Sequence, residues 1–156
     1  MAIIPKVNHP FYTVALIKSR ALKRANGINI IAKIVESGFD IVRMRTKPLC
    51  PTEIEAFYKE HVGRPYYDSL VESVSGGIIA MILEIRDPTL DPIKAWREAI
   101  GATDASKAAE GTFRNLFGGY RFYPNAPLSD NAVHGSGSWT KARFEASLLF
   151  GMPNVK

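Results

Sequence analysis

Short apolar runs alternate along the chain with stretches whose apolar residues recur at helical spacing. The apolar runs predict four strands, at 12–17, 39–45, 78–84 and 131–134. The third run is apolar at nearly every position, which is typical of a strand buried on both faces. The 117–130 stretch contains glycines and prolines without either periodicity, and it predicts a loop.

Helices are predicted between these strands. The first follows Lys18 and ends at Gly38, which supplies a C-terminal stop. Its apolar face is predicted to comprise Ile28, Ile31, Ile34 and Val35. Thr52 and Glu55 have the spacing of a capping box and predict the start of the next helix. Three more helices are predicted at 65–74, 92–100 and 138–150.

Strands interleaved with helices predict an α/β sandwich, with the helices packed on one sheet. No internal repeat, low-complexity tract or flexible linker divides the 156 residues, so we expect one domain over residues 1–156. The pattern leaves the order of the strands in the sheet open.

The composition is ordinary for a globular protein, with 46% hydrophobic and 22% charged residues. It excludes collagen-like, disulfide-rich and disordered chains. The longest apolar run, 78–83, is too short to cross a bilayer, so we expect no membrane partner. The one cysteine, Cys50, cannot form an intrachain disulfide and fits a reducing compartment, so we expect a cytoplasmic protein.

The formal charge of +5 is unevenly distributed along the sequence. Residues 1–50 hold nine bases and two acids, for a net +7, whereas residues 51–156 carry −2. A basic N-terminal third is compatible with a nucleic acid, an anionic membrane surface or a polyphosphate ligand. It is equally compatible with a solvated helix face, and charge alone does not decide between them.

His134 is the best candidate for a catalytic histidine. It ends an apolar strand and is followed by the flexible turn Gly-Ser-Gly-Ser, and such positions often carry function. In the last predicted helix, Glu145 lies along an apolar stripe, where a carboxylate needs a partner. The turn brings this helix back toward His134, which is the predicted partner. The alternative is an ion pair of Glu145 with Lys141 or Arg143.

Several common motifs are missing from the sequence. It contains no GxxxxGK[ST] phosphate loop, no CxxC or HExxH motif for a protein-built metal cage, and no RNP signature of sheet-type RNA binders. Cations lie at the ends of predicted elements, namely Lys18, Arg64, Arg97 and Arg114. Together with His134 they would suit a polyphosphate.

These residues resemble the nucleoside diphosphate kinase family. The segment 131–138, NAVHGSGS, resembles that family's active-site signature N-x-x-H-G/A-S-D-S, and ALIK at 15–18 resembles the strand end with its phosphate lysine. Arg64-Pro65-Tyr66-Tyr67 is similar to R-P-F-F. The segment from Arg97 to Thr103 is similar to R-x-x-x-G-x-T, and 111–114 is similar to G-T-I-R. The matches occur in family order over residues 12–150.

The resemblance implies a ferredoxin-like βαββαβ core, that is, a four-stranded antiparallel sheet with added helices. It also implies ping-pong transfer of the γ-phosphate of a nucleoside triphosphate such as ATP to a nucleoside diphosphate, through phosphohistidine at His134. Glu145 would orient the imidazole, and Tyr58 and Lys18 would line the site. The residues implied to bind the nucleotide are Lys18, Tyr66, Leu70, Arg97, Thr103, Arg114 and Asn131. Among these, Tyr66 would stack on the base and Asn131 would contact the 3′-hydroxyl.

The same resemblance implies Mg²⁺ held through the phosphates and a homo-oligomer, either a hexamer or a tetramer. Four features depart from the family pattern: Ser19-Arg20 replaces Pro-Asp, Gly137 replaces Asp, Ala105 replaces a common Pro, and the link 115–130 is longer. This link is expected to cover the nucleotide or to build a subunit contact. The alternative function is a catalytically weak relative that binds nucleotides or single-stranded nucleic acid, although nucleic acid is the less favoured partner.

Overall fold

The computed structural model describes residues 10–153 and is built on one four-stranded sheet. The strands are β1 (Thr13–Ile17), β2 (Phe39–Lys47), β3 (Ile78–Ile85) and β4 (Val133–Gly135). Their order is β2-β3-β1-β4 and each neighbouring pair is antiparallel. The predicted strands and the ferredoxin-like βαββαβ arrangement are therefore confirmed, and the structure supplies the strand order that the sequence left open.

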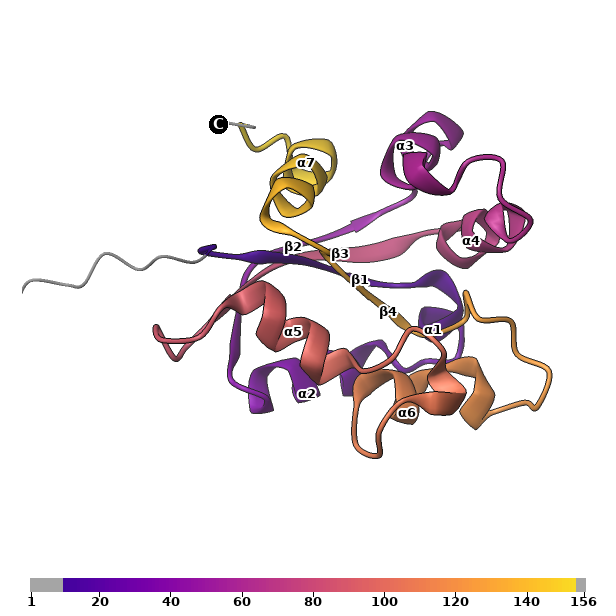
Figure 1. Cartoon of the computed structure of the whole chain (residues 1–156), viewed down its shortest axis with the longest axis horizontal. Coiled ribbons are helices and arrows are strands. Elements are labelled where there is room, and N and C mark those ends of the chain that lie inside the picture. The colour runs from indigo at the N-terminus through magenta and orange to yellow at the C-terminus, as the bar shows by residue number, and fades with distance from the viewer. Residues whose placement is uncertain (1–9, 154–156) are drawn as a thin grey trace, which may run out of the picture.

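The sheet is central because helices cover both of its faces (Figure 1). One face packs against α2 (Gly27–Glu36), α5 (Pro92–Ile100) and α6 (Phe113–Phe117). The other face packs against α3 (Pro51–Phe57), α4 (Tyr67–Val74) and α7 (Trp139–Phe150). Alternate residues of β1 point to the two sides, so Ala15 and Ile17 enter one apolar cluster while Val14 and Leu16 enter the other.

Short helical turns complete the chain. α1 (Ser19–Lys23) follows β1 directly, and three 3₁₀ turns lie at η1 (Lys59–His61), η2 (Ala105–Lys107) and η3 (Gly119–Arg121). The stretch predicted as a loop at 117–130 thus contains the end of α6 and one turn of 3₁₀ helix.

The predicted apolar face of the first helix is partly wrong. Two helices, α1 and α2, occupy this region, and the buried residues of α2 are Ile30 and Ile34. Ile28 is 82% exposed and Val35 is exposed as well. The helical period starts anew at Gly27, after the turn at Ala25, where φ is 61°. Within α2, the face that packs on the sheet is centred on Ile30 and Ile34, with Ile31 partly buried beside them.

The cap of α3 also differs from its prediction. The helix begins at Pro51, with Cys50 as N-cap, and the Cys50 amide donates to the Glu53 carboxylate at 3.3 Å. The box is therefore formed by Cys50 and Glu53 rather than by Thr52 and Glu55. Proline at the first helical position fixes this earlier start, because its missing N–H costs nothing there.

β2 is an edge strand with an exposed outer surface. A register shift between Ile41 and Arg43 marks a bulge in its pairing with β3. Val42 and Met44 are both exposed. No helix within the described part of the chain is both long and apolar enough to span a bilayer.

Candidate active site

His134 lies in the middle of β4, directly opposite Leu16 of β1. Its backbone is held by Trp96, whose indole N–H donates to the His134 carbonyl at 3.1 Å. Gly135 permits this contact, because a Cβ at that position would lie 2.6 Å from the Trp96 ring. The buried indole therefore fixes the backbone position from which the His134 side chain extends.

The imidazole, Glu145 and Ser136 form a hydrogen-bonded chain. His134 Nε2 lies 2.9 Å from the Glu145 carboxylate, whose second oxygen accepts from the Ser136 hydroxyl at 2.6 Å. Glu145 is only 4% exposed. An ionised carboxylate only accepts, so this arrangement places the imidazole hydrogen on Nε2. The contact predicted from the apolar stripe is present, whereas Lys141 pairs with Glu60 instead.

The free nitrogen of the imidazole is Nδ1. Among residues 10–153 it has no hydrogen-bond partner, and the side chain is 18% exposed. The Phe57 ring packs edge-on against the imidazole at a centroid distance of 4.8 Å. The ring is therefore held from its edge and from Nε2, while Nδ1 carries an available lone pair.

Tyr58 follows Phe57 and is buried beside the same carboxylate. Burial raises the pKa of the Tyr58 hydroxyl, and the charge of Glu145 raises it further. The phenol consequently stays protonated at neutral pH and remains a hydrogen-bond donor.

Lys18 is buried at the end of β1. Its ammonium donates to the Ser129 carbonyl at 3.1 Å, and its backbone N–H donates to the Ala132 carbonyl at 2.8 Å. Burial and, to a smaller extent, the Arg114 charge lower the pKa of Lys18 to about 7, while the Asp130 charge acts in the opposite direction. Because burial removes most of the solvation of this ammonium, an anion bound next to it would stabilise its charge.

Arg114 reaches the same region from α6. Its guanidinium donates to the carbonyls of Gly101 and Val133, each at 3.1 Å. Burial lowers the pKa of Arg114 to about 10, and Arg97 contributes to this by repulsion. Arg114 thus interacts electrostatically with both Lys18 and Arg97, whereas Arg64 lies exposed in the turn before α4.

Asn131 and Thr103 meet, but through the backbone of Thr103. The Asn131 amide donates to the Thr103 carbonyl at 2.9 Å, which leaves the Thr103 side chain exposed. The other amide atom of Asn131, Oδ1, is buried without a partner. Next to it, Ala132 has φ 72°, a left-handed conformation that orients the start of β4. An unpaired buried acceptor is costly, so Oδ1 is a candidate contact for a ligand hydroxyl.

Tyr66 is the N-cap of α4, and Leu70 lies in the first half of the same helix. Tyr66 is 49% exposed, and its hydroxyl lies 2.8 Å from Nδ1 of His61. Leu70 is partly buried against the cluster shared by α3, α4 and α7. An exposed aromatic ring with its edge held in place can serve as a stacking platform.

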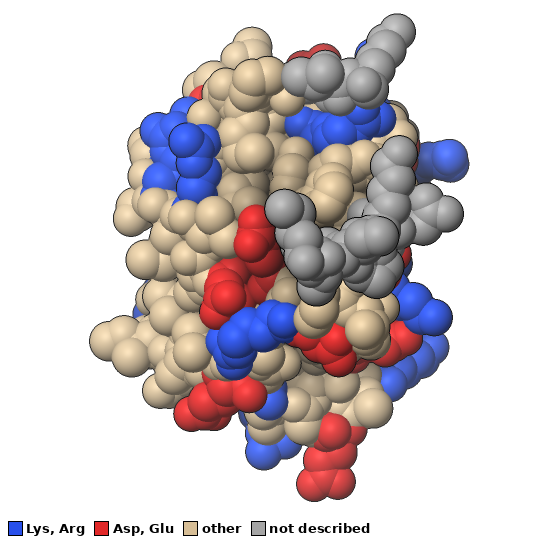
Figure 2. All heavy atoms as spheres, turned by 90° about the vertical axis from the view of Figure 1, so that its left-hand side faces the viewer, with Lys and Arg blue, Asp and Glu red and all other residues tan. Residues whose placement is uncertain are grey.

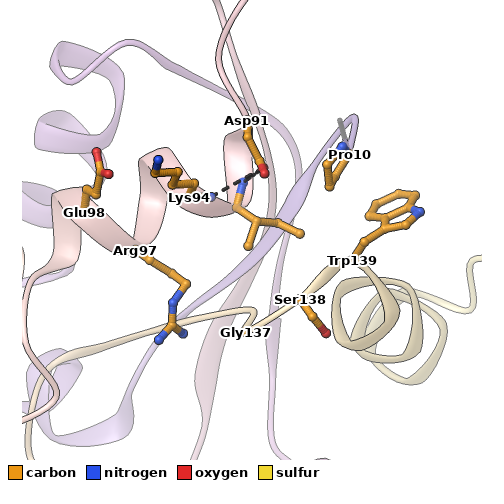
Figure 3. Close-up of a pocket in the computed structure, with 9 residues that line it drawn as sticks. Pro10, Asp91, Lys94, Arg97, Glu98, Gly137, Ser138 and Trp139 are labelled. Atoms are coloured by element: carbon orange, nitrogen blue, oxygen red, sulfur yellow. Dashed lines mark hydrogen bonds between the residues drawn. The ribbon is translucent and has the colours of Figure 1, made fainter. Parts of the chain in front are cut away.

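A cavity of about 510 Å³ lies between α5 and the start of α7 (Figure 3). Arg97 extends toward Gly137 on its wall, and a Cβ on Gly137 would lie 3.9 Å from the Arg97 guanidinium. Lys94, Asp91 and Glu98 add charges of both signs to its lining. Arg97 is therefore the residue shared by this cavity and the cationic group.

Four residues of this site were not predicted from the sequence: Phe57, Trp96, Ser129 and Ser136. Ser136 sits in the recognised signature, so its place in the chain was visible although its contact was not. Phe57, Trp96 and Ser129 approach from other elements, and only the tertiary fold brings them to His134 or Lys18.

Figure 2 shows charged side chains of both signs on the face turned toward the viewer. Acidic and basic side chains are interspersed there between uncharged residues. Within residues 10–153, no three His, Cys, Asp or Glu side chains form a set able to hold a metal ion.

Comparison with known proteins identifies relatives over almost the whole chain. A family model described as nucleoside diphosphate kinase matches residues 12–155. Nucleoside diphosphate kinase from Sorangium cellulosum is 37% identical over 88% of this chain and 89% of its own length. The enzyme of the same name from Rickettsia canadensis is 34% identical over 92% and 96%.

Solved structures agree with the sequence relatives. Nucleoside diphosphate kinase from Aquifex aeolicus superposes with a TM-score of 0.77 at 30% identity, covering 90% of this chain and 94% of that one. A halophilic nucleoside diphosphate kinase from Halobacterium salinarum in complex with CDP gives a TM-score of 0.76 at 27% identity, covering 92% and 90%.

Proposed function

The chain belongs to the nucleoside diphosphate kinase family of phosphotransferases, and on this premise we propose that it moves the γ-phosphate of a nucleoside triphosphate such as ATP to a nucleoside diphosphate through phosphohistidine at His134. The observation that carries the proposal is the imidazole held through Nε2 by Glu145, with Nδ1 left unbonded. We assign this chemistry to a single kinase-like domain spanning the chain.

The reaction divides into two half-reactions that share one intermediate. In the first, the Nδ1 lone pair of His134 attacks the γ-phosphorus, and the bond from that phosphorus to the β–γ bridging oxygen breaks, releasing the diphosphate. In the second, a terminal phosphate oxygen of the acceptor diphosphate attacks the same phosphorus and the N–P bond breaks. The Nε2 hydrogen stays in place throughout, and Glu145 stabilises the positive charge on the substituted ring.

The cations have a defined task in this scheme. Phosphoryl transfer requires positioning and stabilisation of charge spread over the equatorial oxygens. Lys18, Arg97 and Arg114 supply positive charge from three different elements, and the exposed Thr103 hydroxyl adds a donor. The protonated Tyr58 phenol is buried beside Glu145 and can donate to a transferring oxygen.

The nucleoside is held by other contacts. Tyr66 stacks on the base with Leu70 beside it, and the orphaned Oδ1 of Asn131 accepts from the 3′-hydroxyl of the sugar. Stacking tolerates every base because each has a π-face, so we expect broad base selectivity. The relative from Halobacterium salinarum was solved in complex with CDP, which supports a nucleotide ligand for this fold.

Mg²⁺ fits this site if it is bound to the nucleotide rather than to protein side chains. The residues around the phosphates are cations, so the ion's ligands would be phosphate oxygens and water, a coordination that Mg²⁺ commonly adopts. When bound, the ion neutralises part of the charge on the β- and γ-oxygens. Positioning of the γ-phosphorus against Nδ1 remains the work of the side chains.

The test is covalent labelling with γ-³²P-ATP. We expect an acid-labile, base-stable phosphoprotein that discharges its label to GDP. His134→Ala should take up no label, lose transfer and keep most of its nucleotide affinity, whereas the control His61→Ala should still be labelled. Folded wild-type protein that takes up no label would refute the proposal. That result, together with binding to single-stranded nucleic acid that weakens steeply with salt, would favour the non-catalytic alternative.

We also propose a homo-oligomer, a hexamer or a tetramer, located in the cytoplasm. The apolar side chains exposed on the β2 edge strand and on α2 support self-association, among them Val42, Met44, Ile28 and Val35. The exposed free thiol of Cys50 suits a reducing compartment. Light scattering checks the assembly, because a hexamer or tetramer has six or four times the mass of one chain.

A further inference from the structure

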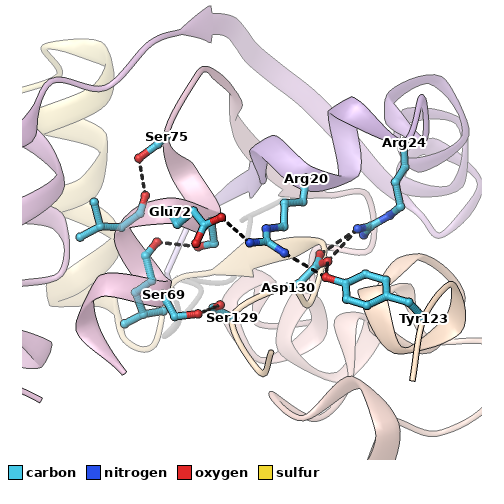
Figure 4. A network of polar contacts seen from close by, with 11 residues as sticks. Arg20, Arg24, Ser69, Glu72, Ser75, Tyr123, Ser129 and Asp130 are labelled. Carbon is cyan, nitrogen blue, oxygen red and sulfur yellow. Dashed lines mark hydrogen bonds and ion pairs between the residues drawn. The ribbon is translucent and has the colours of Figure 1, made fainter. Parts of the chain in front are cut away.

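A chain of polar contacts joins α1 to the connection 118–132 and to α4 (Figure 4). At its centre, the Asp130 carboxylate accepts from Arg24 at 2.8 and 3.0 Å and from the Tyr123 hydroxyl at 2.6 Å. The Tyr123 hydroxyl in turn accepts from Arg20, which also pairs with Glu72. Residues of the long connection thus hold the helix that follows Lys18.

Asp130 is the buried member of this network. Its side chain is 1% exposed, compared with 17% for Arg24 and 67% for Glu72 at the far end. The adjoining Gly119 amide donates to the Asp130 carbonyl at 2.7 Å, and a Cβ on Gly119 would collide with the carboxylate. Both the backbone and the side chain of Asp130 are therefore fixed.

The two neighbours of Asp130 both contact the candidate site. Ser129 accepts from the Lys18 ammonium through its carbonyl, and its hydroxyl lies 2.5 Å from that of Ser69 on α4. Asn131 is bonded to the Thr103 carbonyl and presents its orphaned oxygen. A change in the backbone position of Asp130 would therefore also move its chain neighbours Ser129 and Asn131.

We propose that Asp130 is a positioning residue of the active site: clamped by Arg24 and Tyr123, its carboxylate sets the Ser129–Asn131 segment against Lys18 and supplies the counter-charge of that buried ammonium. This inference rests on the proposed function. Several residues of this network occur where the chain departs from the family pattern. Arg20 belongs to one departure, and Tyr123 and Asp130 belong to another, the long connection.

The charges around Lys18 determine in which direction each substitution should move its pKa. The charged groups that act on Lys18 are Arg114 from α6 and Asp130 from the connection, and they act in opposite directions. Arg24, the C-cap of α1, is paired with Asp130, so its own charge partly offsets that of the carboxylate. Removing the Asp130 charge should therefore lower the pKa of Lys18, and removing the Arg24 charge should raise it.

The experiment measures the Lys18 titration and the pH profile of kcat/KM, which reports groups of the free enzyme. In Asp130→Asn we expect the ¹³Cε titration of Lys18 and the alkaline limb of kcat/KM to move to lower pH by about 0.5 to 1 unit. This shift lowers kcat/KM about 3- to 10-fold above pH 8, with a narrowing difference toward pH 6. Asp130→Glu should restore most of the profile.

Arg24→Gln provides a second variant with the opposite expected sign, and it serves if Asp130→Asn does not fold. The matched control is Asp40→Asn, which removes an aspartate from another Arg–Asp pair, at the opposite end of β3 from the strand position next to Lys18. It should leave both readouts unchanged. A constant loss at every pH with an unmoved Lys18 titration would reduce Asp130 to a structural residue and overturn the inference.

Failure of the inference is distinguishable from failure of the proposed function. If wild-type protein takes up no phosphate, the function fails, while the ¹³Cε titration still reports the coupling of Lys18 to Asp130. If wild-type protein transfers phosphate and both variants titrate like it, the function stands and the role of Asp130 is refuted.

Discussion

Replacing Lys18 by methionine should abolish phosphate transfer and stabilise the fold. The ammonium is fully buried, and its pKa falls from 10.5 in the unfolded chain to about 7. Between these values the unfolded chain binds a proton that the folded protein releases, so stability rises with pH in this window. Below pH 7 the cost of the buried ammonium is present in full.

The magnitude follows from the separation of the two pKa values. Each pH unit of separation corresponds to about 1.4 kcal/mol, so the ammonium costs about 4 kcal/mol at pH 7 and about 3 kcal/mol at pH 8.5. Methionine removes this cost but leaves the Ser129 carbonyl without its donor, which costs about 1 kcal/mol. The net expectation is a gain of about 3 kcal/mol at pH 7.

Urea unfolding of wild type and Lys18→Met at pH 7 and 8.5 measures both quantities. The variant should unfold about 1 M or more later at pH 7, given slopes of about 1–3 kcal/mol per molar urea. Its advantage should shrink by about 1–2 kcal/mol at pH 8.5, because the wild type gains stability there. Lys23→Met on the exposed side of α1 is the control and should change stability by less than about 0.5 kcal/mol.

A variant no more stable than wild type would refute this reasoning. So would an advantage that does not depend on pH, because it would show that apolar packing, rather than relief of a buried charge, is responsible.

Two further predictions concern the support of the imidazole. Gly135→Ala places a methyl group against the Trp96 ring and should lower the free energy of unfolding by about 1–3 kcal/mol, measured by urea unfolding; unchanged stability would show that the ring yields freely. Glu145→Gln can donate to Nε2 of His134 and so move the ring hydrogen to Nδ1, and kcat should fall about 10²-fold or more in coupled ATP–GDP assays while the fold persists. Near-normal kcat would contradict the assigned nucleophilic nitrogen.

Local sequence patterns predicted the strands and the long helices well, because each has a clear periodicity or a clear stop. α5 spans the predicted residues, with Pro92 at its start and Gly101 after its end. The prediction for α2 failed because the helix carries isoleucines on several sides: the face that packs on the sheet is centred on Ile30 and Ile34, and apolar spacing alone does not distinguish it from the face with Ile28 and Val35.

The candidate site was predictable where one segment carries it. The imidazole and its carboxylate partner lie on consecutive elements joined by a short turn, so burial of Glu145 was enough to pair them. Asp130 and Trp96 were beyond prediction, because their contacts cross from one element to another far along the chain. Such contacts depend on strand order, which no local pattern contains.

The shortness of β4 has a consequence for inactivation. β4 lies at the edge of the sheet, and its three residues pair only with β1. It can therefore separate from β1 while β1, β2 and β3 remain paired. Fraying would withdraw His134 from Glu145 without unfolding either cluster of apolar residues. On heating, loss of turnover should then precede the calorimetric transition, and deuterium should enter the amides of β4 before those of β3.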